Sequence, residues 1–219
     1  MTRGQILLSL IPFAYLFGSI PFGLIVGKAR GIDPRTAGSG NIGATNLGRL
    51  LGAKFFAIVF FLDLLKGAIP TFTAGAVIGF HVDDRQTALL WMIIAAVAVI
   101  GHIFSIFLKF KGGKGVATSA GVVLGIFPYF TFAAVAALMV FYIVFRVTRY
   151  ISVGSMVGAL SFPVAYVAIG IGRWPITGAQ LPMLCFAGFF PLLLIFKHRT
   201  NIARLRAGTE PHYTPRPSC

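Results

Sequence analysis

The order of apolar and polar residues along the chain predicts a series of membrane-spanning helices. Long apolar runs occupy residues 5–27, 55–79, 88–108, 115–146, 151–171 and 180–196. Most of these runs are close to the roughly 20 residues that an α-helix needs to cross about 30 Å of hydrocarbon. The fourth run is too long for one ordinary span, and Pro128 interrupts it. Because proline ends or kinks a helix, we expect two helices there, 115–127 and 129–146.

The first of these two helices, 115–127, is short for a transmembrane segment. At 1.5 Å per residue it is about 20 Å long, well below the thickness of the hydrocarbon layer. We therefore expect that surrounding protein shields this helix from lipid, or that the membrane is thinner beside it.

Composition supports a single membrane domain. Of the 219 residues, 57% are hydrophobic and only 11% are charged, and the mean hydropathy is +0.88. A soluble domain normally carries about 25% charged residues to cover its surface. We predict one all-α, polytopic domain over residues 1–219, in which the proline-rich segment 207–219 is a flexible tail. The first apolar run lacks a small-residue cleavage site, so we expect it to be retained.

Basic residues decide the number of spans. The chain has 19 Lys and Arg against 5 Asp and Glu, and the cytoplasmic loops of membrane proteins carry the excess of Lys and Arg. Seven spans with the N-terminus outside put fifteen basic residues on cytoplasmic segments and three outside, whereas six spans divide them nine to nine. We therefore predict seven helices, the fourth of them short, with the C-terminus in the cytoplasm. Segments 28–54, 109–114 and 197–219 then share one face, where their charge suits anionic headgroups or phosphorylated substrates rather than nucleic acid.

The first polar segment, 37–49, combines glycines with neutral hydrogen-bond donors and ends in an arginine. Glycine lets successive backbone N–H groups turn towards an anion, and an arginine adds a charged, two-pronged donor. The candidate phosphate-binding residues here are Ser39, Gly40, Asn41, Asn46 and Arg49. The alternative is a flexible polar loop between two helices.

The second polar segment, 109–118, places three lysines and three glycines before the short helix. A helix N-terminus binds anions through its free N–H groups and its dipole, and lysines strengthen that binding. The segment is not a Walker A loop, because glycine follows Lys114 and the upstream glycine is missing. The candidates are Lys111, Gly112, Gly113, Lys114 and Gly115. The alternative is a basic turn whose lysines meet lipid headgroups.

The third polar segment, 197–210, pairs a histidine with an asparagine. His198 and Asn201 are three residues apart, so on a helix they face the same way. His198 can bind a phosphate or accept a proton, and we expect Asn201 to orient it. The alternative is an amphipathic basic helix on the membrane surface. We expect Glu210 to pair with a nearby arginine rather than to act in catalysis.

Ionisable residues inside the apolar runs need partners, because charge in hydrocarbon is costly. Asp63 and Lys66 lie three apart in the second run, which predicts a mutual ion pair or a contact with a polar loop. We expect His102 to be a hydrogen-bonded structural histidine. Cys185 and Cys219 predict neither a disulfide framework nor a metal site.

The sequence lacks the residues that several types of reaction require. Five acidic residues, none of them clustered, cannot build a multi-carboxylate Mg²⁺ or Ca²⁺ site, so we expect no metal and no cofactor. No serine lies in a G-x-S-x-G turn. Phosphate binding and the positioning of substrates are therefore expected to carry the chemistry.

The three polar segments together resemble the signature loops of the bacterial acyl-phosphate:glycerol-3-phosphate acyltransferases. The resemblance lies in residues 39–46, 111–118 and 197–202, and it extends to loop order and spacing over nearly the whole chain. It implies a seven-helix protein of the bacterial plasma membrane whose active site faces the cytoplasm; we expect a monomer. By this resemblance Ser39, Asn41, Arg49, His198 and Asn201 bind substrate or support catalysis. The Gly-Gly-Lys-Gly loop is similarly associated with the acyl phosphate.

The reaction implied by the resemblance joins two phosphorylated substrates. The C1 hydroxyl of sn-glycerol 3-phosphate attacks the acyl carbon of an acyl phosphate, which gives 1-acyl-glycerol 3-phosphate and inorganic phosphate. Either His198 or the leaving phosphate accepts the proton, and we favour the phosphate because no carboxylate is available to orient a histidine base. Competing hypotheses are a transporter of organic phosphate and a non-catalytic lipid-binding scaffold. The transporter is less favoured, because the candidate residues gather at one interface and no repeat is visible.

Overall fold

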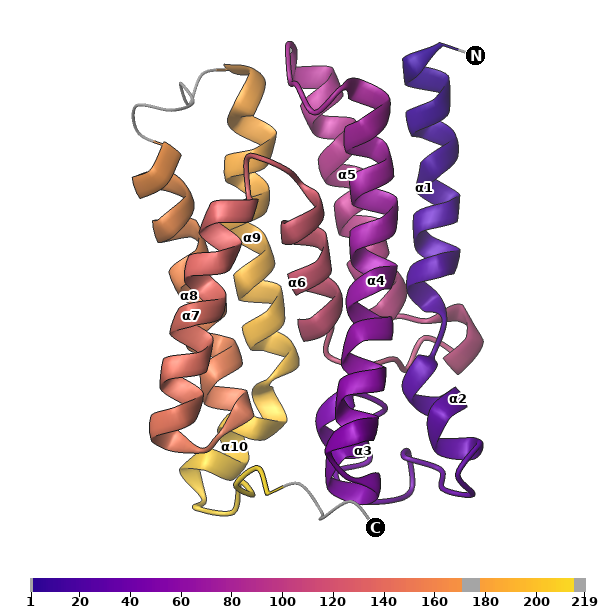
Figure 1. Cartoon of the computed structure of the whole chain (residues 1–219), viewed down its shortest axis with the longest axis vertical. Helices are drawn as coiled ribbons and strands as arrows, with labels where there is room; N and C mark the ends of the chain where they lie inside the picture. Colours follow the sequence, from indigo (N-terminus) through magenta and orange to yellow (C-terminus); the bar gives the residue numbers. More distant parts are fainter. Residues whose placement is uncertain (1, 171–177, 215–219) are drawn as a thin grey trace.

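The computed structural model describes residues 2–170 and 178–214, and the regular structure in these residues is entirely helical. Six segments are long and apolar enough to cross a membrane: Arg3–Lys28, Ala53–Ile78, Arg85–Leu108, Thr131–Thr148, Ile151–Gly170 and Gly178–Lys197. A further apolar helix, α6 (Val116–Gly125), is shorter. The spans lie side by side along one long axis (Figure 1). The expectation of an all-helical membrane protein with one short helix is confirmed.

The first span is broken, which the hydropathy pattern does not reveal. It consists of α1 (Arg3–Ser19) and α2 (Phe22–Lys28), which are separated at Ile20 and Pro21. Pro21 has no N–H to donate, so the hydrogen-bond ladder of α1 cannot continue through it. The other long helices are α4 (Ala53–Ile78), α5 (Arg85–Ile103), α7 (Thr131–Thr148), α8 (Ile151–Gly170) and α9 (Leu181–Lys197), with the 3-10 turns η1 (Ile106–Leu108) and η2 (Gly178–Gln180) beside α5 and α9.

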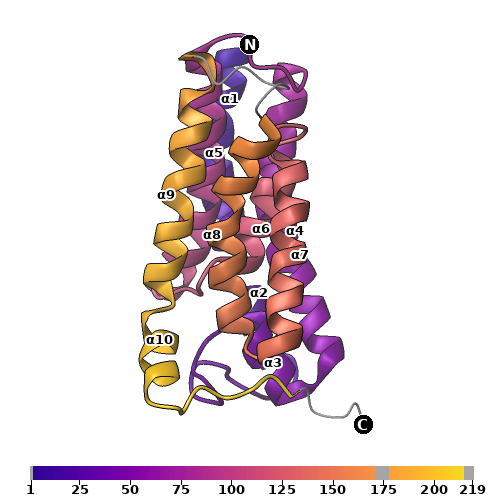
Figure 2. The same cartoon turned by 90° about the vertical axis from the view of Figure 1, so that its left-hand side faces the viewer.

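The fourth apolar run divides at Pro128, as expected. Helix α6 ends at Gly125 and α7 begins at Thr131, so Pro128 lies in the connection between them. Helix α6 packs against α4, α5 and α7, and therefore lies within the bundle rather than at its periphery. Figures 1 and 2 both show α6 among the longer helices. The expected shielding by protein is confirmed.

Two short helices lie at the end of the bundle opposite the start of α1 (Figure 1). Helix α10 (Arg199–Arg206) follows α9, and α3 (Ala44–Leu51) lies within segment 28–54. The interpretation of residues 44–51 as loop is therefore wrong. Its apolar positions Ala44, Leu47 and Leu51 have helical spacing, and Leu47 is fully buried.

Glycines allow three helix pairs to pack with their backbones in contact. A methyl group on Gly18 of α1 would lie 2.3 Å from the Ala98 carbonyl oxygen of α5, and one on Gly67 of α4 would lie 2.1 Å from the Thr118 carbonyl oxygen of α6. In a bilayer the hydrophobic effect does not drive helices together, so such close packing stabilises their association. Helices α7 and α8 pair in the same way through Gly154 and Gly158.

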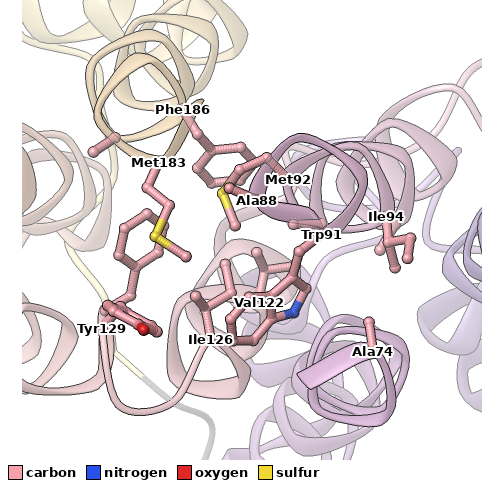
Figure 3. Packing of buried hydrophobic residues seen from close by; sticks show 14 of the residues in the cluster. Ala74, Ala88, Trp91, Met92, Ile94, Val122, Ile126, Tyr129, Met183 and Phe186 are labelled. Atoms are coloured by element: carbon pink, nitrogen blue, oxygen red, sulfur yellow. The ribbon is translucent and has the colours of Figure 1, made fainter. Parts of the chain in front are cut away.

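The main apolar core lies where α4, α5, α6 and α9 meet (Figure 3). Trp91 of α5 is fully buried at its centre, and its indole Nε1 donates a hydrogen bond of 2.8 Å to the Thr71 carbonyl of α4. The indole therefore fills the core without leaving a buried donor unpaired. Val122, Met183 and Phe186 pack in the same core.

The buried ion pair within α4 is formed as expected. Lys66 Nζ lies 2.9 Å from Asp63 Oδ1, and the two residues are 1% and 3% exposed. Lys66 also donates a 2.9 Å hydrogen bond to the carbonyl of Ile20, at the break between α1 and α2. The pair thus neutralises two charges in a non-aqueous interior and supplies a donor to a carbonyl at the helix break.

The contact between α4 and α6 can be tested with one added methyl group. In Gly121→Ala, the new methyl would lie 1.9 Å from the Leu64 carbonyl oxygen of α4. Overpacking of this kind costs about 1–3 kcal/mol, so we expect a lower apparent Tm in detergent. Gly188→Ala in α9 is the matched control, because no atom lies within 4 Å of its added methyl. Equal melting temperatures for both variants would contradict this account of the packing.

Candidate phosphate-binding site

The three polar segments converge on one pocket of about 840 Å³. Eight of the twelve candidate residues line it: Ser39, Asn41, Asn46, Arg49, Lys114, Gly115, His198 and Asn201. The other four candidates, Gly40, Lys111, Gly112 and Gly113, do not line this pocket. The pocket extends from α3 and α10 at one end of the bundle to Asp63 and His102 within the long helices.

Two helix N-termini meet at this pocket. Gly43, Ala44 and Thr45 begin α3, and Gly115 and Val116 begin α6, and all five residues line the pocket. The first N–H groups of a helix have no partner within it, and the helix dipole makes this end positive. The sequence predicts the second of these anion-binding ends but not the first, because residues 44–51 look like loop. Together they make this part of the pocket favourable for an anion.

The side chain of Asn46 holds the first loop in shape. Its Nδ2 donates to the carbonyls of Pro34, Ala37 and Asn41 at 2.8–3.1 Å, and its Oδ1 accepts from the Ser39 N–H at 2.9 Å. Asn46 is 1% exposed. Its hydrogen-bonding capacity is therefore occupied by the loop itself, which fixes Ser39 and Asn41 at the pocket wall.

The second loop folds back onto the end of α5. Gly112 and Gly113 donate backbone hydrogen bonds of 3.1 Å to the carbonyls of Ile103 and His102. A methyl group on Gly113 would lie 2.3 Å from His102 Nε2, so only glycine permits this close approach. Gly112 and Gly113 thus hold the loop against the end of α5, and Lys114 and Gly115 line the pocket.

A chain of hydrogen bonds links the second and third segments. Lys114 Nζ donates to Asn201 Oδ1, and Asn201 Nδ2 donates to Glu210 Oε1 at 2.6 Å. Burial lowers the pKa of Lys114 to about 8, partly opposed by the negative charge of Glu210. The expectation that Asn201 orients His198 is wrong, because its amide is bonded to Lys114 and Glu210.

His198 is oriented by the backbone of the preceding helix. Its Nδ1 lies 2.8 Å from the Leu194 carbonyl oxygen, which can only accept, so we assign the proton to Nδ1 and a lone pair to Nε2. The residue is 2% exposed, and burial lowers its pKa to about 4. His198 is therefore neutral near pH 7 and offers Nε2 as a hydrogen-bond acceptor.

Glu210 joins α8 and α10 beside the pocket. Its Oε2 accepts from Arg204 Nε at 2.7 Å, and its Oε1 accepts from Ser152 Oγ at 2.8 Å as well as from Asn201. Burial raises the pKa of Glu210, but these hydrogen bonds outweigh burial and hold the pKa below its usual value. The expected pairing of Glu210 with an arginine is confirmed, with Arg204 as the partner.

Arg49 keeps donors available at the pocket. Its Nη2 donates a 3.0 Å hydrogen bond to the Pro211 carbonyl, whereas its Nε is buried without a hydrogen-bond partner in the described chain. Burial lowers the pKa of Arg49, and Glu210 partly offsets this. A guanidinium with an unused buried donor is suited to an anionic ligand.

The pocket wall also contains polar residues that were not among the candidates, among them Thr45, Asp63, His102 and Ser152. His102 Nδ1 is buried 3.7 Å from Asp63 Oδ1 and has no hydrogen-bond partner among the described residues. The expectation of a hydrogen-bonded histidine is therefore wrong for this atom. The sequence does contain a signal for Asp63 and His102, because ionisable residues inside apolar runs indicate functional sites. Ser152 carries no such signal, because it resembles any other small residue of a packed helix.

An apolar cavity of about 650 Å³ adjoins the pocket. It is lined by residues of α6, α7, α8 and α9, among them Ala120, Phe141, Phe162 and Phe186. Val116, Phe141 and Ser155 line both the cavity and the pocket. The polar pocket and a space that suits a hydrocarbon chain thus share part of their walls.

Comparison with known proteins identifies the family. A family model described as glycerol-3-phosphate acyltransferase matches residues 8–208. The chain is 42% identical to a glycerol-3-phosphate acyltransferase of Listeria monocytogenes serotype 4a over 212 residues, covering 96% of this chain and 98% of that protein. It is 39% identical to one of Aquifex aeolicus, covering 93% and 97%.

Solved structures agree with the sequence matches. The glycerol 3-phosphate form of PlsY, an integral membrane glycerol 3-phosphate acyltransferase, is similar with a TM-score of 0.82 and 38% identity, covering 95% of this chain and 96% of that one. Its lysophosphatidic acid form is similar with a TM-score of 0.79, covering 95% of both chains. The resemblance drawn from the three polar segments is confirmed, and the chain belongs to the glycerol-3-phosphate acyltransferase family.

Proposed function

We propose that the protein transfers an acyl group from an acyl phosphate to sn-glycerol 3-phosphate. The C1 hydroxyl attacks the acyl carbon, the bond from that carbon to the phosphate oxygen breaks, and the products are 1-acyl-glycerol 3-phosphate and inorganic phosphate. The observation that carries this proposal is a pocket with two helix N-termini, Arg49 and Lys114, which shares part of its wall with an apolar cavity. The two compartments fit the two ends of an acyl phosphate, and the pocket also accommodates glycerol phosphate.

Positioning of the two substrates supplies much of the rate acceleration. Ser39, Asn41 and Arg49 hold one phosphate from the α3 side, and Lys114 and Gly115 hold the other from the α6 side. Proper orientation of two bound reactants contributes about 7–11 kcal/mol to lowering a barrier. Fixed positive groups also stabilise the charge that builds on the departing phosphate. Asn46 acts by shaping the first loop rather than by touching substrate.

The departing phosphate is a better proton acceptor than His198. Burial lowers the pKa of His198 to about 4, whereas a phosphoryl group has a second pKa of about 6. The proton of the attacking hydroxyl therefore passes more favourably to the phosphate. His198 orients that hydroxyl by accepting its hydrogen bond at Nε2. The carbonyl of Leu194 keeps the ring in the tautomer that this requires.

The protein lies in the bacterial plasma membrane with its pocket towards the cytoplasm. Basic residues gather at the end of the bundle that carries α3 and α10, as the positive-inside rule requires for a cytoplasmic face. The acyl chain enters the apolar cavity laterally from the bilayer.

Phosphate release tests the proposed reaction. Purified protein in detergent should release phosphate from palmitoyl phosphate when sn-glycerol 3-phosphate is present, with lysophosphatidic acid as the co-product. Release in the absence of glycerol phosphate should be negligible, because water is a poorly positioned acceptor. A folded sample that releases no phosphate would overturn the proposal and favour transport, which flux through reconstituted vesicles would measure.

Two substitutions test the roles of Arg49 and His198. Arg49→Ala removes a charged donor to a substrate phosphate, so we expect roughly a 100-fold loss of kcat/KM. His198→Ala should lose at least about ten-fold through poorer orientation of the hydroxyl. Both variants should insert and fold. Arg206→Ala, at an exposed position of α10, is the matched control and should retain full activity. Normal turnover by both Arg49→Ala and His198→Ala would refute the site.

The lowered pKa of Lys114 predicts a pH dependence. Lys114 is charged below about pH 8 and neutral above it, so kcat/KM should fall as the pH rises through about 8. In Lys114→Arg this fall should disappear, because arginine remains protonated over the accessible range. Initial rates at low substrate between pH 6 and 10 would measure both profiles. Identical profiles for wild type and variant would exclude Lys114 as the titrating group.

A further inference from the structure

The chain after α10 forms a strap, residues 208–213, across the end of the molecule. Figure 2 shows this segment running from α10 beneath α8 and α7 towards α3. Its flexibility, expected for all of 207–219, remains a prediction, but residues 210–213 make specific contacts with five helices and with the connection between α7 and α8. Residues 215–219 lie outside the described part of the chain.

One side of the strap is attached to α7, α8 and α10. Glu210 bonds with Ser152, Asn201 and Arg204. The Tyr213 N–H donates a 3.0 Å hydrogen bond to the carbonyl of Arg149 at the end of α7. The His212 ring stacks on Tyr150, with ring centroids 4.3 Å apart.

The other side of the strap is attached to α3 and α4. The half-buried ring of Tyr213 lies between Phe56 of α4 and Phe145 of α7, with centroids 5.5 and 6.1 Å away. A methyl group on Gly48 of α3 would lie 2.6 Å from the Tyr213 hydroxyl, so the two residues are in close contact. Tyr213 therefore joins two parts of the bundle that face each other across the pocket.

These two parts have no other extensive contact at this end. Among the described residues, α3 packs mainly on α4, and neither packs extensively on α7, α8 or α10. The pocket lies between them, with Arg49 on one side and Asn201 and His198 on the other. The strap thus sets the distance between groups that must act on the same substrates.

The strap also determines which donors of Arg49 face the pocket. The Pro211 carbonyl accepts a 3.0 Å hydrogen bond from Nη2, while the buried Nε has no hydrogen-bond partner among residues 2–170 and 178–214. An arginine side chain has many rotamers, and a fixed acceptor at one end of the guanidinium removes most of them before substrate binds. The remaining donors are left to bind a phosphate.

We propose that Tyr213 is a positioning residue for Arg49. By anchoring the strap against Gly48 and Phe56, Tyr213 holds the Pro211 carbonyl where it orients the guanidinium towards the substrate phosphate. The inference rests on the proposed role of Arg49 in phosphate binding. It assigns a part in the reaction to a tyrosine that does not line the pocket.

The test compares KM values for palmitoyl phosphate and glycerol 3-phosphate in two variants. Arg49→Lys should raise the KM of whichever substrate Arg49 binds, because lysine cannot donate two parallel hydrogen bonds to one phosphate. Tyr213→Ala should raise the KM of the same substrate by about ten-fold. Tyr213→Phe keeps the ring against Phe56 and Phe145 and loses only the hydroxyl beside Gly48, so its KM should rise by less than about two-fold. Arg206→Ala is a surface control. If Tyr213→Ala does not fold, Tyr213→Leu replaces it, since it removes the aromatic contacts but preserves bulk.

A double-mutant cycle separates positioning from a merely structural role. If Tyr213 acts through Arg49, the KM effect of Tyr213→Ala should shrink to less than about two-fold in the Arg49→Lys background. Effects that multiply, or a Tyr213→Ala enzyme with unchanged KM values, would overturn the inference. An inactive wild type would refute the proposed function itself. A wild type that turns over, combined with an Arg49→Lys variant of unchanged KM values, would refute only the role of Arg49 and the inference with it.

Discussion

The close approach of α6 to α4 governs where the chemistry of this protein can take place. Gly67 of α4 and Gly121 of α6 let the two backbones touch, which holds the short helix inside the bundle. Since α6 begins only at Val116, its unpaired N–H groups lie beside the long helices. Unpaired backbone donors are costly in hydrocarbon, so the N-terminus of α6 must face a polar space or bind an anion. The pocket provides that polar space, and the other basic groups gather around it.

The site lies where a polar pocket meets an apolar cavity. On one side, α3, α10 and the basic loops provide charged and neutral donors; on the other, α7, α8 and α9 line an apolar cavity. Val116, Phe141 and Ser155 belong to both walls, so the transition takes place within the length of a few side chains. A lipid precursor with an anionic head and an apolar chain fits such a boundary, which explains why an enzyme of this family is built into a membrane.

Charge in the site is balanced by hydrogen-bonded pairs. Glu210 faces Arg204 and, through Asn201, Lys114, while Asp63 neutralises Lys66 deeper in the bundle. Each acid lowers the cost of burying neighbouring cations, which would otherwise repel one another in a low dielectric. Arg49 has no carboxylate partner in the described chain, and it is held by a backbone carbonyl instead. Its positive charge therefore remains available to a ligand.

The sequence by itself predicted the membrane-spanning segments, the short helix among them and the family. Apolar run length, Pro128 and the distribution of basic residues predict the spans, because a bilayer imposes fixed lengths and charge placement. Three glycine-rich or basic segments predict phosphate binding and the family. Only the tertiary structure decided that Gly113 supports a loop, that Asn201 bonds to Lys114 rather than His198, and that Tyr213 packs between Phe56 and Phe145. These contacts join residues far apart in the chain, and a single sequence carries no record of such distances.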